Sequence, residues 1–349
     1  MTARHKAVRT DRELECPGID AGLRAAGCDL LTLPDGVGED DLIAAVRDID
    51  LLLMCYTPVT ARVIAAAEKL KGIVKYGVGI DAIDIAAAMA RRIPVVNVPD
   101  YAEETVAEGA FALMIALAKK LMPLGREMAA KGWAWPTPQW RGLDLSGRTL
   151  GLVGTGKIGR SMARMAAGFR MRVIGYDPHV PAEAMRAGGV EKVAHLNALL
   201  ALSDIVSIHA VLDAQTRHLI GAGELAAMKP SAFLINVSRG AIVDEAALVA
   251  ALRDKRIAGA ALDVYSREPL AHAGHPMSAL FGMDNVILFP HLTFFTDEAM
   301  ARLEADTLAR CMEILEGRPV LVKSHDPRLR AQRHGVIFAD DGRAAGTRG

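Results

Sequence analysis

Three segments place a chemically active side chain soon after a stretch that is predicted to be a strand. Arg239 follows the apolar run at 232–237, Glu268 stands in a loop after the run at 259–264, and His291 lies between apolar runs. Ligands bind beyond the carboxyl ends of the strands in open α/β sheets, so one site can collect all three side chains. A guanidinium, a carboxylate and an imidazole together suit the binding of an acid and the transfer of a proton near neutral pH.

A glycine-rich turn indicates a dinucleotide site. Residues 151–159 read GLVGTGKIG, with GxGxxG at Gly154, Gly156 and Gly159. A strand candidate precedes the motif and a helical pattern follows it. The first glycine permits the tight turn, the second lets the backbone approach a pyrophosphate, and the third allows close helix–strand packing. The helix N-terminus offers N–H groups to the phosphates.

Asp177 predicts which dinucleotide binds. It ends the next strand candidate, 18 residues after Gly159. Its carboxylate can accept hydrogen bonds from the adenosine ribose, and its charge repels a 2′-phosphate. Pro178 and His179 follow, with no Arg or Lys to bind that phosphate. The sequence therefore predicts NAD as cofactor, in preference to NADP.

Two series of alternating strands and helices predict two α/β domains with parallel sheets. In the first hundred residues, strands are expected at 50–55, 72–76 and 94–98, with helices at 60–70 and 84–91. In the second series, strands are expected at 149–153, 172–176, 205–210, 232–237 and 259–264, with helices at 158–168, 182–187, 222–228 and 245–254.

The remaining segments connect or follow these series. A long helix is expected from residue 103 to about 121, and a last helix from 297 to about 316. The loop 132–142 holds all three Trp residues, and we expect it to pack on its own domain or on a partner subunit. From Lys323 the chain turns polar and rich in Gly and Arg, which predicts a mobile tail.

Composition excludes several classes of function. The chain has 349 residues, with 41 Lys+Arg and 41 Asp+Glu, so it carries no broad charge for nucleic acid or an acidic membrane surface. The 4 Cys are scattered without a CxxC pair, and His272 and His275 lack an acid or Cys cluster, so no metal site is predicted. No apolar leader or membrane span is visible, and we expect a cytoplasmic protein.

Residues from about 51 to 317 resemble the D-isomer-specific 2-hydroxyacid dehydrogenase family. Several independent motifs occur in the family's order, which makes the resemblance far more specific than the glycine turn alone. They are KYGVGIDAID (75–84), NVPDYAEETVAE (97–108), GLVGTGKIGRSMA (151–163), MKPSAFLINVSRGAIVDEAALVAAL (228–252), ALDVYSREPL (261–270) and PHLTFFTDEA (290–299).

The resemblance implies that Arg239, Glu268 and His291 are catalytic. His291 would exchange the hydroxyl proton of a 2-hydroxy acid while a hydride moves between its C2 atom and the nicotinamide. Glu268 would orient the imidazole and favour its protonated form. Arg239 would pair with the substrate carboxylate and polarise the C2 oxygen.

The resemblance also implies binding positions. Val78 and Gly79 would offer backbone N–H groups to the substrate carboxylate, and Asp263 would contact the nicotinamide carboxamide. Many relatives carry Pro and Thr at Val211 and Asp213, so we expect slightly altered packing there without loss of NAD binding. Further positions that match dinucleotide-lining residues are Thr105, Lys157, Ile158, Val211, Thr216 and Val237.

Substrate choice is expected to depend on loop 54–58, which contains Tyr56, on Tyr101, and on residues 292–295. Phosphoglycerate dehydrogenases tend to carry an Arg in the first of these loops to hold a phosphate. Met54 occupies that place here. A small unphosphorylated 2-hydroxy or 2-keto acid is therefore expected, such as glyoxylate, hydroxypyruvate, pyruvate or a short branched analogue.

Two alternatives use the same fold. Phosphite dehydrogenases keep the Glu–His pair, whereas formate dehydrogenases lack it, so Glu268 argues only against the latter. Carboxy-terminal-binding corepressors act as NAD-sensing scaffolds, and the stretch 97–108 is similar to theirs. A peptide-binding groove on the first domain would distinguish them.

The implied architecture is α/β, with two Rossmann-like domains. An NAD-binding domain at 103–294 is inserted into a flavodoxin-like substrate-binding domain made of 1–102 and 295–322, and the tail comprises 323–349. Helices at the two crossings would form a hinge whose closure excludes water. By analogy, a homodimer is expected through the cofactor domain, with the Trp-rich loop as an arm.

Overall fold

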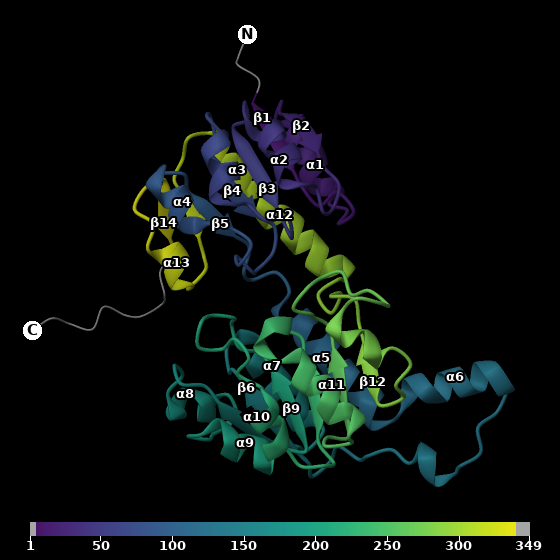
Figure 1. Ribbon diagram of the computed structural model, residues 1–349. Coiled ribbons are helices and arrows are strands. Elements are labelled where there is room, and N and C mark those ends of the chain that lie inside the picture. Colours follow the sequence, from purple (N-terminus) through teal and green to yellow (C-terminus); the bar gives the residue numbers. More distant parts are fainter. Residues whose placement is uncertain (1–4, 340–349) are drawn as a thin grey trace, which may run out of the picture. The chain divides into compact units, whose positions relative to one another are not determined.

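The computed structural model describes residues 5–339 (Figure 1). The chain divides into two compact units. One comprises the residues up to Ala102 together with those from Thr296 on, and the other comprises Glu103–Phe295. Each unit is built on a parallel sheet with flanking helices, so the predicted α/β class is confirmed. We call them unit 1 and unit 2.

Unit 1 has the sheet order β2-β1-β3-β4-β5, which is the flavodoxin-like order that the resemblance implies. β3 and β4 are buried along their whole length because helices cover both faces of the sheet. The elements up to residue 97 are β1 (Lys6–Arg9), α1 (Pro17–Ala25), β2 (Asp29–Thr32), α2 (Glu39–Val46), β3 (Leu51–Met54), α3 (Ala61–Ala66), β4 (Gly72–Lys75), α4 (Ile85–Ala90) and β5 (Val95–Asn97).

α12 (Asp297–Leu315) returns the chain to this sheet and lies against α1, β3 and β4 (Figure 1). Thr296 begins the helix, because its side-chain oxygen accepts a hydrogen bond from the N–H of Ala299 at 3.2 Å. Gly22 on α1 permits the close approach, since a Cβ there would lie 2.3 Å from the Leu308 side chain.

The segment after α12 is folded, so the predicted mobile tail is wrong over residues 323–339. β13 (Val320–Val322), α13 (Pro327–Arg330) and β14 (Val336–Phe338) follow one another, and β13 pairs with β14. Gln332 anchors the segment because its amide accepts a hydrogen bond from Val95 N at 2.7 Å and donates to Val95 O at 2.9 Å. Residues 340–349 lie outside the described residues.

Unit 2 has the sheet order β12-β11-β10-β9-β6-β7-β8. When β6 is numbered 1 and the sheet is read from β8 to β12, the order is 3-2-1-4-5-6-7. This is the Rossmann order, and its switch point lies between β6 and β9. The elements are α5 (Glu103–Ala118), α6 (Leu121–Lys131), β6 (Thr149–Val153), α7 (Lys157–Gly168), β7 (Arg172–Tyr176), α8 (Ala182–Ala187), β8 (Glu191–Lys192), α9 (Leu196–Leu202), β9 (Ile205–Ile208), α10 (Ala222–Ala227), β10 (Phe233–Asn236), α11 (Glu245–Arg253), β11 (Gly259–Leu262) and β12 (Val286–Leu288).

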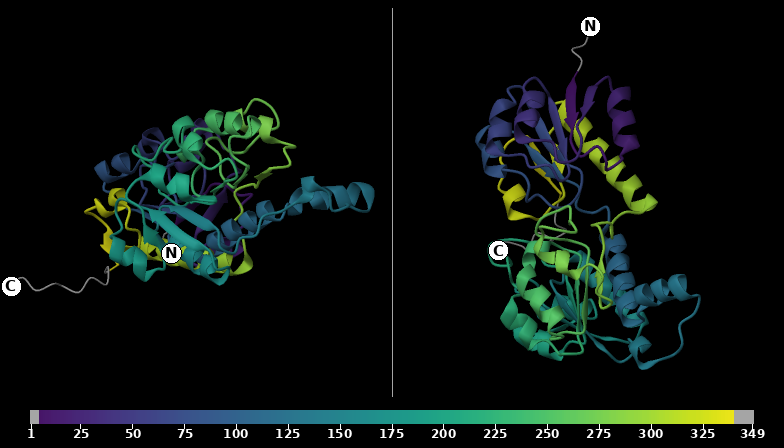
Figure 2. Two further views of the ribbon diagram at one scale, coloured as in Figure 1. Left: turned by 90° about the horizontal axis from the view of Figure 1, so that it is seen from below. Right: turned by 45° about the vertical axis from the view of Figure 1, so that its right-hand side comes forward.

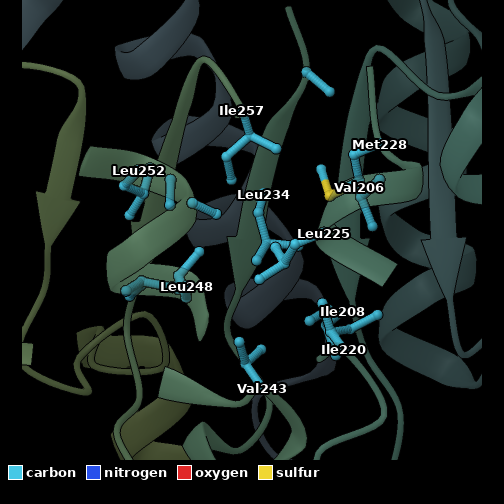
Figure 3. Close-up of a cluster of buried hydrophobic side chains, with 14 of the residues drawn as sticks. Val206, Ile208, Ile220, Leu225, Met228, Leu234, Val243, Leu248, Leu252 and Ile257 are labelled. Atoms are coloured by element: carbon cyan, nitrogen blue, oxygen red, sulfur yellow. The ribbon is translucent and has the colours of Figure 1, made fainter. Parts of the chain in front are cut away.

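Apolar side chains cover both faces of this sheet. On one face, Ile208 and Leu234 pack with side chains from α10 and α11, as Figure 3 shows. On the other face, Leu150 and Ile235 pack with residues of α5 and α7 such as Met114. This packing fixes the carboxyl ends of the strands, where the candidate site lies. No helix among residues 5–339 has the length and apolar character of a membrane span.

The long helix expected from residue 103 to about 121 is confirmed as α5, which ends at Ala118, and a second helix, α6, begins at Leu121. Lys120 adopts a left-handed backbone with φ of 53°, which ends α5 and lets α6 start in a new direction. α6 and the loop after it project from the rest of unit 2 (Figures 1 and 2). Trp133 and Trp135 in that loop are 60% and 73% exposed.

Candidate active site

The three predicted catalytic residues follow three neighbouring strands of unit 2. Arg239 follows β10, Glu268 follows β11 and His291 follows β12, and these strands lie side by side in the sheet. Because the strands are parallel, their carboxyl ends meet at one edge. The topology therefore brings together three side chains that are spread over more than fifty positions of the sequence.

His291 and Glu268 form a direct pair. His291 Nδ1 lies 2.8 Å from Glu268 Oε2, and the two side chains are 27% and 29% exposed. The other carboxylate oxygen, Oε1, accepts a hydrogen bond from Tyr265 N at 2.9 Å. Burial acts to raise the pKa of Glu268, but the bond to His291 and the charges of His291 and Arg239 outweigh it and lower that pKa. The carboxylate of Glu268 is therefore ionised at neutral pH.

Asp263 holds the backbone that follows His291. Its two oxygens accept hydrogen bonds from Leu292 N at 2.9 Å and from Thr293 N at 3.1 Å, and Thr293 Oγ1 also donates to it. Burial raises the pKa of Asp263 despite these bonds. His291 itself has a φ of 58°, which non-glycine residues adopt rarely. Asp263 thus holds the strained segment that orients the imidazole, and its expected contact with the nicotinamide stays a prediction.

Arg239 is held by its own loop. Asn236 Nδ2 donates to Arg239 O at 3.0 Å, and Arg239 Nη1 donates to Ser238 O at 2.7 Å. Gly240 lets this loop pack on the next one, since a Cβ there would lie 1.9 Å from the carbonyl carbon of Tyr265. Tyr265 also donates to Glu268. The Arg239 loop and the Glu268 loop are therefore in contact.

Glu245 is a residue of this region that the sequence analysis missed. Its two oxygens accept hydrogen bonds from Ser266 N and Ser266 Oγ, both at 2.6 Å, and the residue is 7% exposed. Glu245 begins α11, where an acid has an ordinary role beside the helix dipole. The sequence pattern therefore does not predict that the Glu245 carboxylate holds the loop that carries Glu268.

The glycine turn has the geometry that the motif predicts. Gly154 has a φ of 90°, and a Cβ there would lie 2.7 Å from Ala210 N. A Cβ on Gly159 would lie 2.5 Å from Gly154 O, whereas a Cβ on Gly156 would meet nothing within 4 Å. α7 begins at Lys157 without a side-chain cap. Its first N–H groups and the open backbone at Gly156 fit a pyrophosphate.

Asp177 lies beside this turn. It is half-buried, and its two oxygens accept hydrogen bonds from Thr155 N and His179 N, both at 2.9 Å. These bonds fix the carboxylate while lone pairs remain for further donors. The position and charge of Asp177 fit the ribose of a dinucleotide.

His209 is a second residue that the sequence analysis missed. It follows β9 at the switch point, and a Cβ on Gly154 would lie 2.7 Å from its carbonyl carbon. Its Nε2 lies 2.9 Å from Ser207 Oγ, and burial lowers the pKa of the ring to about 4. Its Nδ1 is buried and has no hydrogen-bond partner among residues 5–339. An unsatisfied polar atom beside the glycine turn is a further feature that fits a polar ligand there.

The other predicted cofactor positions also lie in unit 2. Thr105 is on α5, Ile158 is on α7, and Lys157 Nζ pairs with Glu103 at 2.8 Å. Val211 is 67% exposed, and Thr216 Oγ1 donates to Val211 O at 2.7 Å. Val237, directly after β10, is buried.

The predicted substrate residues lie at the carboxyl edge of unit 1. Asn97 Nδ2 donates to Val78 O at 2.6 Å, and no residue of 5–339 accepts a hydrogen bond from the N–H of Val78 or Gly79. Tyr56 is 40% exposed after β3, whereas Tyr101 is buried, and its carbonyl accepts from Arg302 Nε at 2.7 Å.

Comparisons with known proteins show the family of the chain. The family described as D-isomer specific 2-hydroxyacid dehydrogenase, NAD binding domain, matches residues 111–293. A glyoxylate reductase of Korarchaeum cryptofilum is 41% identical over 75% of this chain and 78% of its own length. A D-3-phosphoglycerate dehydrogenase of Methanocaldococcus jannaschii is 38% identical over 81% of this chain, which spans only 53% of that protein.

A solved structure has a similar fold. The D-lactate dehydrogenase of Aquifex aeolicus, complexed with NAD and lactic acid, superposes with a TM-score of 0.78 at 26% identity, over 89% of this chain and 96% of that one. The chain therefore belongs to the D-isomer specific 2-hydroxyacid dehydrogenase family.

Proposed function

We propose that this protein interconverts a small D-2-hydroxy acid and its 2-keto acid with NAD(H). The observation that carries the proposal is the 2.8 Å hydrogen bond between His291 Nδ1 and Glu268 Oε2, at the strand edge that also presents Arg239. An imidazole backed by a carboxylate is suited to moving one proton. A neighbouring guanidinium is suited to holding a carboxylate.

In the direction of reduction, each residue has one task. When bound, the reduced nicotinamide supplies a hydride to the C2 carbon of the keto acid. Arg239 binds the substrate carboxylate and polarises the C2 carbonyl, so negative charge developing on that oxygen is stabilised. His291 gives the proton from Nε2 to the oxygen, while Glu268 balances the positive charge of the imidazolium through Nδ1. Oxidation of the hydroxy acid reverses both transfers.

Residues of unit 1 are also proposed to bind the substrate. The N–H groups of Val78 and Gly79 are suited to donate hydrogen bonds to the substrate carboxylate, because the described residues leave both without an acceptor. Tyr56, Tyr101 and residues 292–295 would set the size of the substrate. Met54 is fully buried in β3 and loop 54–58 carries no Arg, which supports an unphosphorylated substrate such as glyoxylate.

We also propose that NAD is preferred to NADP. The fixed carboxylate of Asp177 would accept hydrogen bonds from the ribose hydroxyls, and a 2′-phosphate would meet its negative charge. Thr105, Lys157, Ile158, Val211, Thr216 and Val237 are proposed to line the rest of the dinucleotide.

The proposed assembly is a homodimer through unit 2 in the cytoplasm. Exposed apolar side chains on α6 and at Trp133 and Trp135 are unfavourable in water. This supports the proposal that α6 and the loop after it form an arm that packs on a second copy of the chain. The four cysteines are all free thiols, as is usual in a reducing compartment. Sedimentation equilibrium tests the dimer, and a wild-type monomer at micromolar concentration would contradict it.

The decisive test of the activity is a substrate panel. We expect NADH consumption with glyoxylate, hydroxypyruvate or pyruvate, and less with phosphohydroxypyruvate. NAD reduction by phosphite is the control for the phosphite dehydrogenase alternative. Absence of turnover with every 2-keto acid, or NAD reduction with phosphite alone, would overturn the proposal.

A further inference from the structure

A buried carboxylate lies directly beneath loop 54–58 in unit 1. Asp11 follows β1, is 1% exposed, and adopts a left-handed backbone with φ of 55°. Among non-glycine residues, Asp and Asn tolerate this conformation best. β1 and β3 are neighbours in the sheet, so the residue after β1 lies beside the residues after β3.

The carboxylate of Asp11 binds three consecutive backbone N–H groups of that loop. Its Oδ2 accepts from Cys55 N at 2.7 Å and from Tyr56 N at 3.0 Å, and its Oδ1 accepts from Thr57 N at 3.1 Å. Thr57 Oγ1 donates to Oδ1 as well, at 2.7 Å. Bonds to an ionised acceptor are stronger than neutral ones, so this contact fixes the backbone of the loop firmly.

Lys75 binds a backbone carbonyl group of the same loop. Its Nζ donates to Cys55 O, lies 3.1 Å from Cys55 Sγ, and lies 5.3 Å from the centre of the Tyr56 ring. Lys75 is 5% exposed at the end of β4. The N–H groups of the loop therefore face an anion and its carbonyl faces a cation.

The turn that carries Asp11 is itself anchored. Arg9 is 2% exposed and pairs with Asp20 through two hydrogen bonds of 2.7 and 3.1 Å. Burial acts to lower the pKa of Arg9, but the hydrogen bonds to Asp20 and the nearby Tyr76 outweigh it and raise that pKa above its ordinary value, so the guanidinium stays charged. Its Nη1 also donates to Leu14 O at 3.2 Å. The carboxylate thus has a rigid support.

We infer that Asp11 is a positioning residue that sets substrate affinity by fixing the backbone of loop 54–58, and so the place of Tyr56. The inference rests on the proposed function, which makes this loop part of the substrate site. Asp11 touches the loop and not the substrate, so its loss weakens binding more than it slows the chemical step.

The test compares two variants with a matched control. Asp11→Asn keeps the size of the side chain but turns one acceptor into a donor that faces N–H groups. Thr57→Val removes only the 2.7 Å hydroxyl bond and keeps the fold. Gln332→Glu is the control: it replaces an amide by a carboxylate, the reverse of Asp11→Asn, at a side chain of the same unit that bonds to the backbone of Val95.

For Asp11→Asn we expect KM for the best 2-keto acid to rise about tenfold, with kcat within about threefold of wild type and NADH affinity unchanged. Thr57→Val should raise KM by a smaller factor. Gln332→Glu should lower Tm without changing KM. Unchanged KM in both Asp11→Asn and Thr57→Val, or an equal rise in Gln332→Glu, would overturn the inference.

Amide hydrogen exchange gives a readout that does not need turnover. Protection of the N–H groups of residues 55–57 should fall in Asp11→Asn and persist in Gln332→Glu. If the wild-type protein reduces no 2-keto acid, the proposed function is refuted, and the hydrogen-exchange result still tests the positioning role of Asp11. If exchange at residues 55–57 is the same in wild type and Asp11→Asn, the positioning role fails whatever the substrate.

Discussion

The variant Glu268→Gln isolates the charge that backs the imidazole. The amide keeps the size of the side chain, and its oxygen can still accept the hydrogen bond from Tyr265 N, which is 2.9 Å long in the wild type. Its NH₂ group then faces His291 Nδ1 and can only donate to it. An imidazolium with a proton on Nδ1 is therefore disfavoured, and the ring becomes a poorer proton donor for reduction.

The size of the effect follows from the geometry of the pair. Hydrogen bonds to charged groups contribute about 1.5–3 kcal/mol, and about 1.4 kcal/mol corresponds to a tenfold change in rate. The two side chains are 27% and 29% exposed, so solvent screens the pair only in part. We expect kcat/KM for reduction of the best 2-keto acid to fall by about 10- to 100-fold.

The assay is the initial rate of NADH oxidation at saturating NADH. Glu245→Gln is the matched control, because Glu245 anchors the same loop through Ser266 without facing His291. It should lower Tm but leave kcat/KM within about threefold of wild type. The reasoning is refuted if Glu268→Gln retains full kcat/KM, or if Glu245→Gln loses as much.

Two other predictions concern the cofactor site and pH. Asp177→Ala should relax the preference for NAD, because the charge that opposes a 2′-phosphate is gone; an unchanged ratio of kcat/KM for NADH and NADPH would remove Asp177 from the cofactor site. His209 has a folded-state pKa of about 4, so between pH about 6.5 and 4 the unfolded chain takes up a proton that the folded chain does not. The free energy of unfolding should therefore fall over this range, by up to about 3 kcal/mol more in wild type than in His209→Gln. Urea titrations at several pH values measure the free energy of unfolding. If it changes with pH equally in wild type and in His209→Gln, the burial of a neutral His209 ring is contradicted.

The strands and the glycine turn were predictable because their signals are local. Runs such as 149–153 and 232–237 are mostly apolar, and the strands that they form are buried after the first residue, as is typical of strands covered on both faces. The Rossmann order then places Arg239, Glu268 and His291 at one edge without further information. The fold class and the meeting of these side chains in unit 2 therefore follow from patterns that the sequence displays.

The features that the sequence did not reveal depend on distant partners. β2 alternates between exposed and half-buried residues, so it lacks the apolar run of a central strand. The folded end of unit 1 depends on the contact of Gln332 with Val95, which is far away in the sequence. Asp11, Glu245 and His209 have ordinary residue types for their positions, and only their tertiary contacts distinguish them.

Replacement of the imidazole tests the proposed chemistry most directly. In His291→Ala, turnover of the best 2-keto acid should fall by about 10²-fold or more, while NADH binds with the wild-type dissociation constant. Both quantities come from one preparation, by NADH absorbance and by fluorescence titration. Turnover close to that of the wild type would contradict proton transfer by His291.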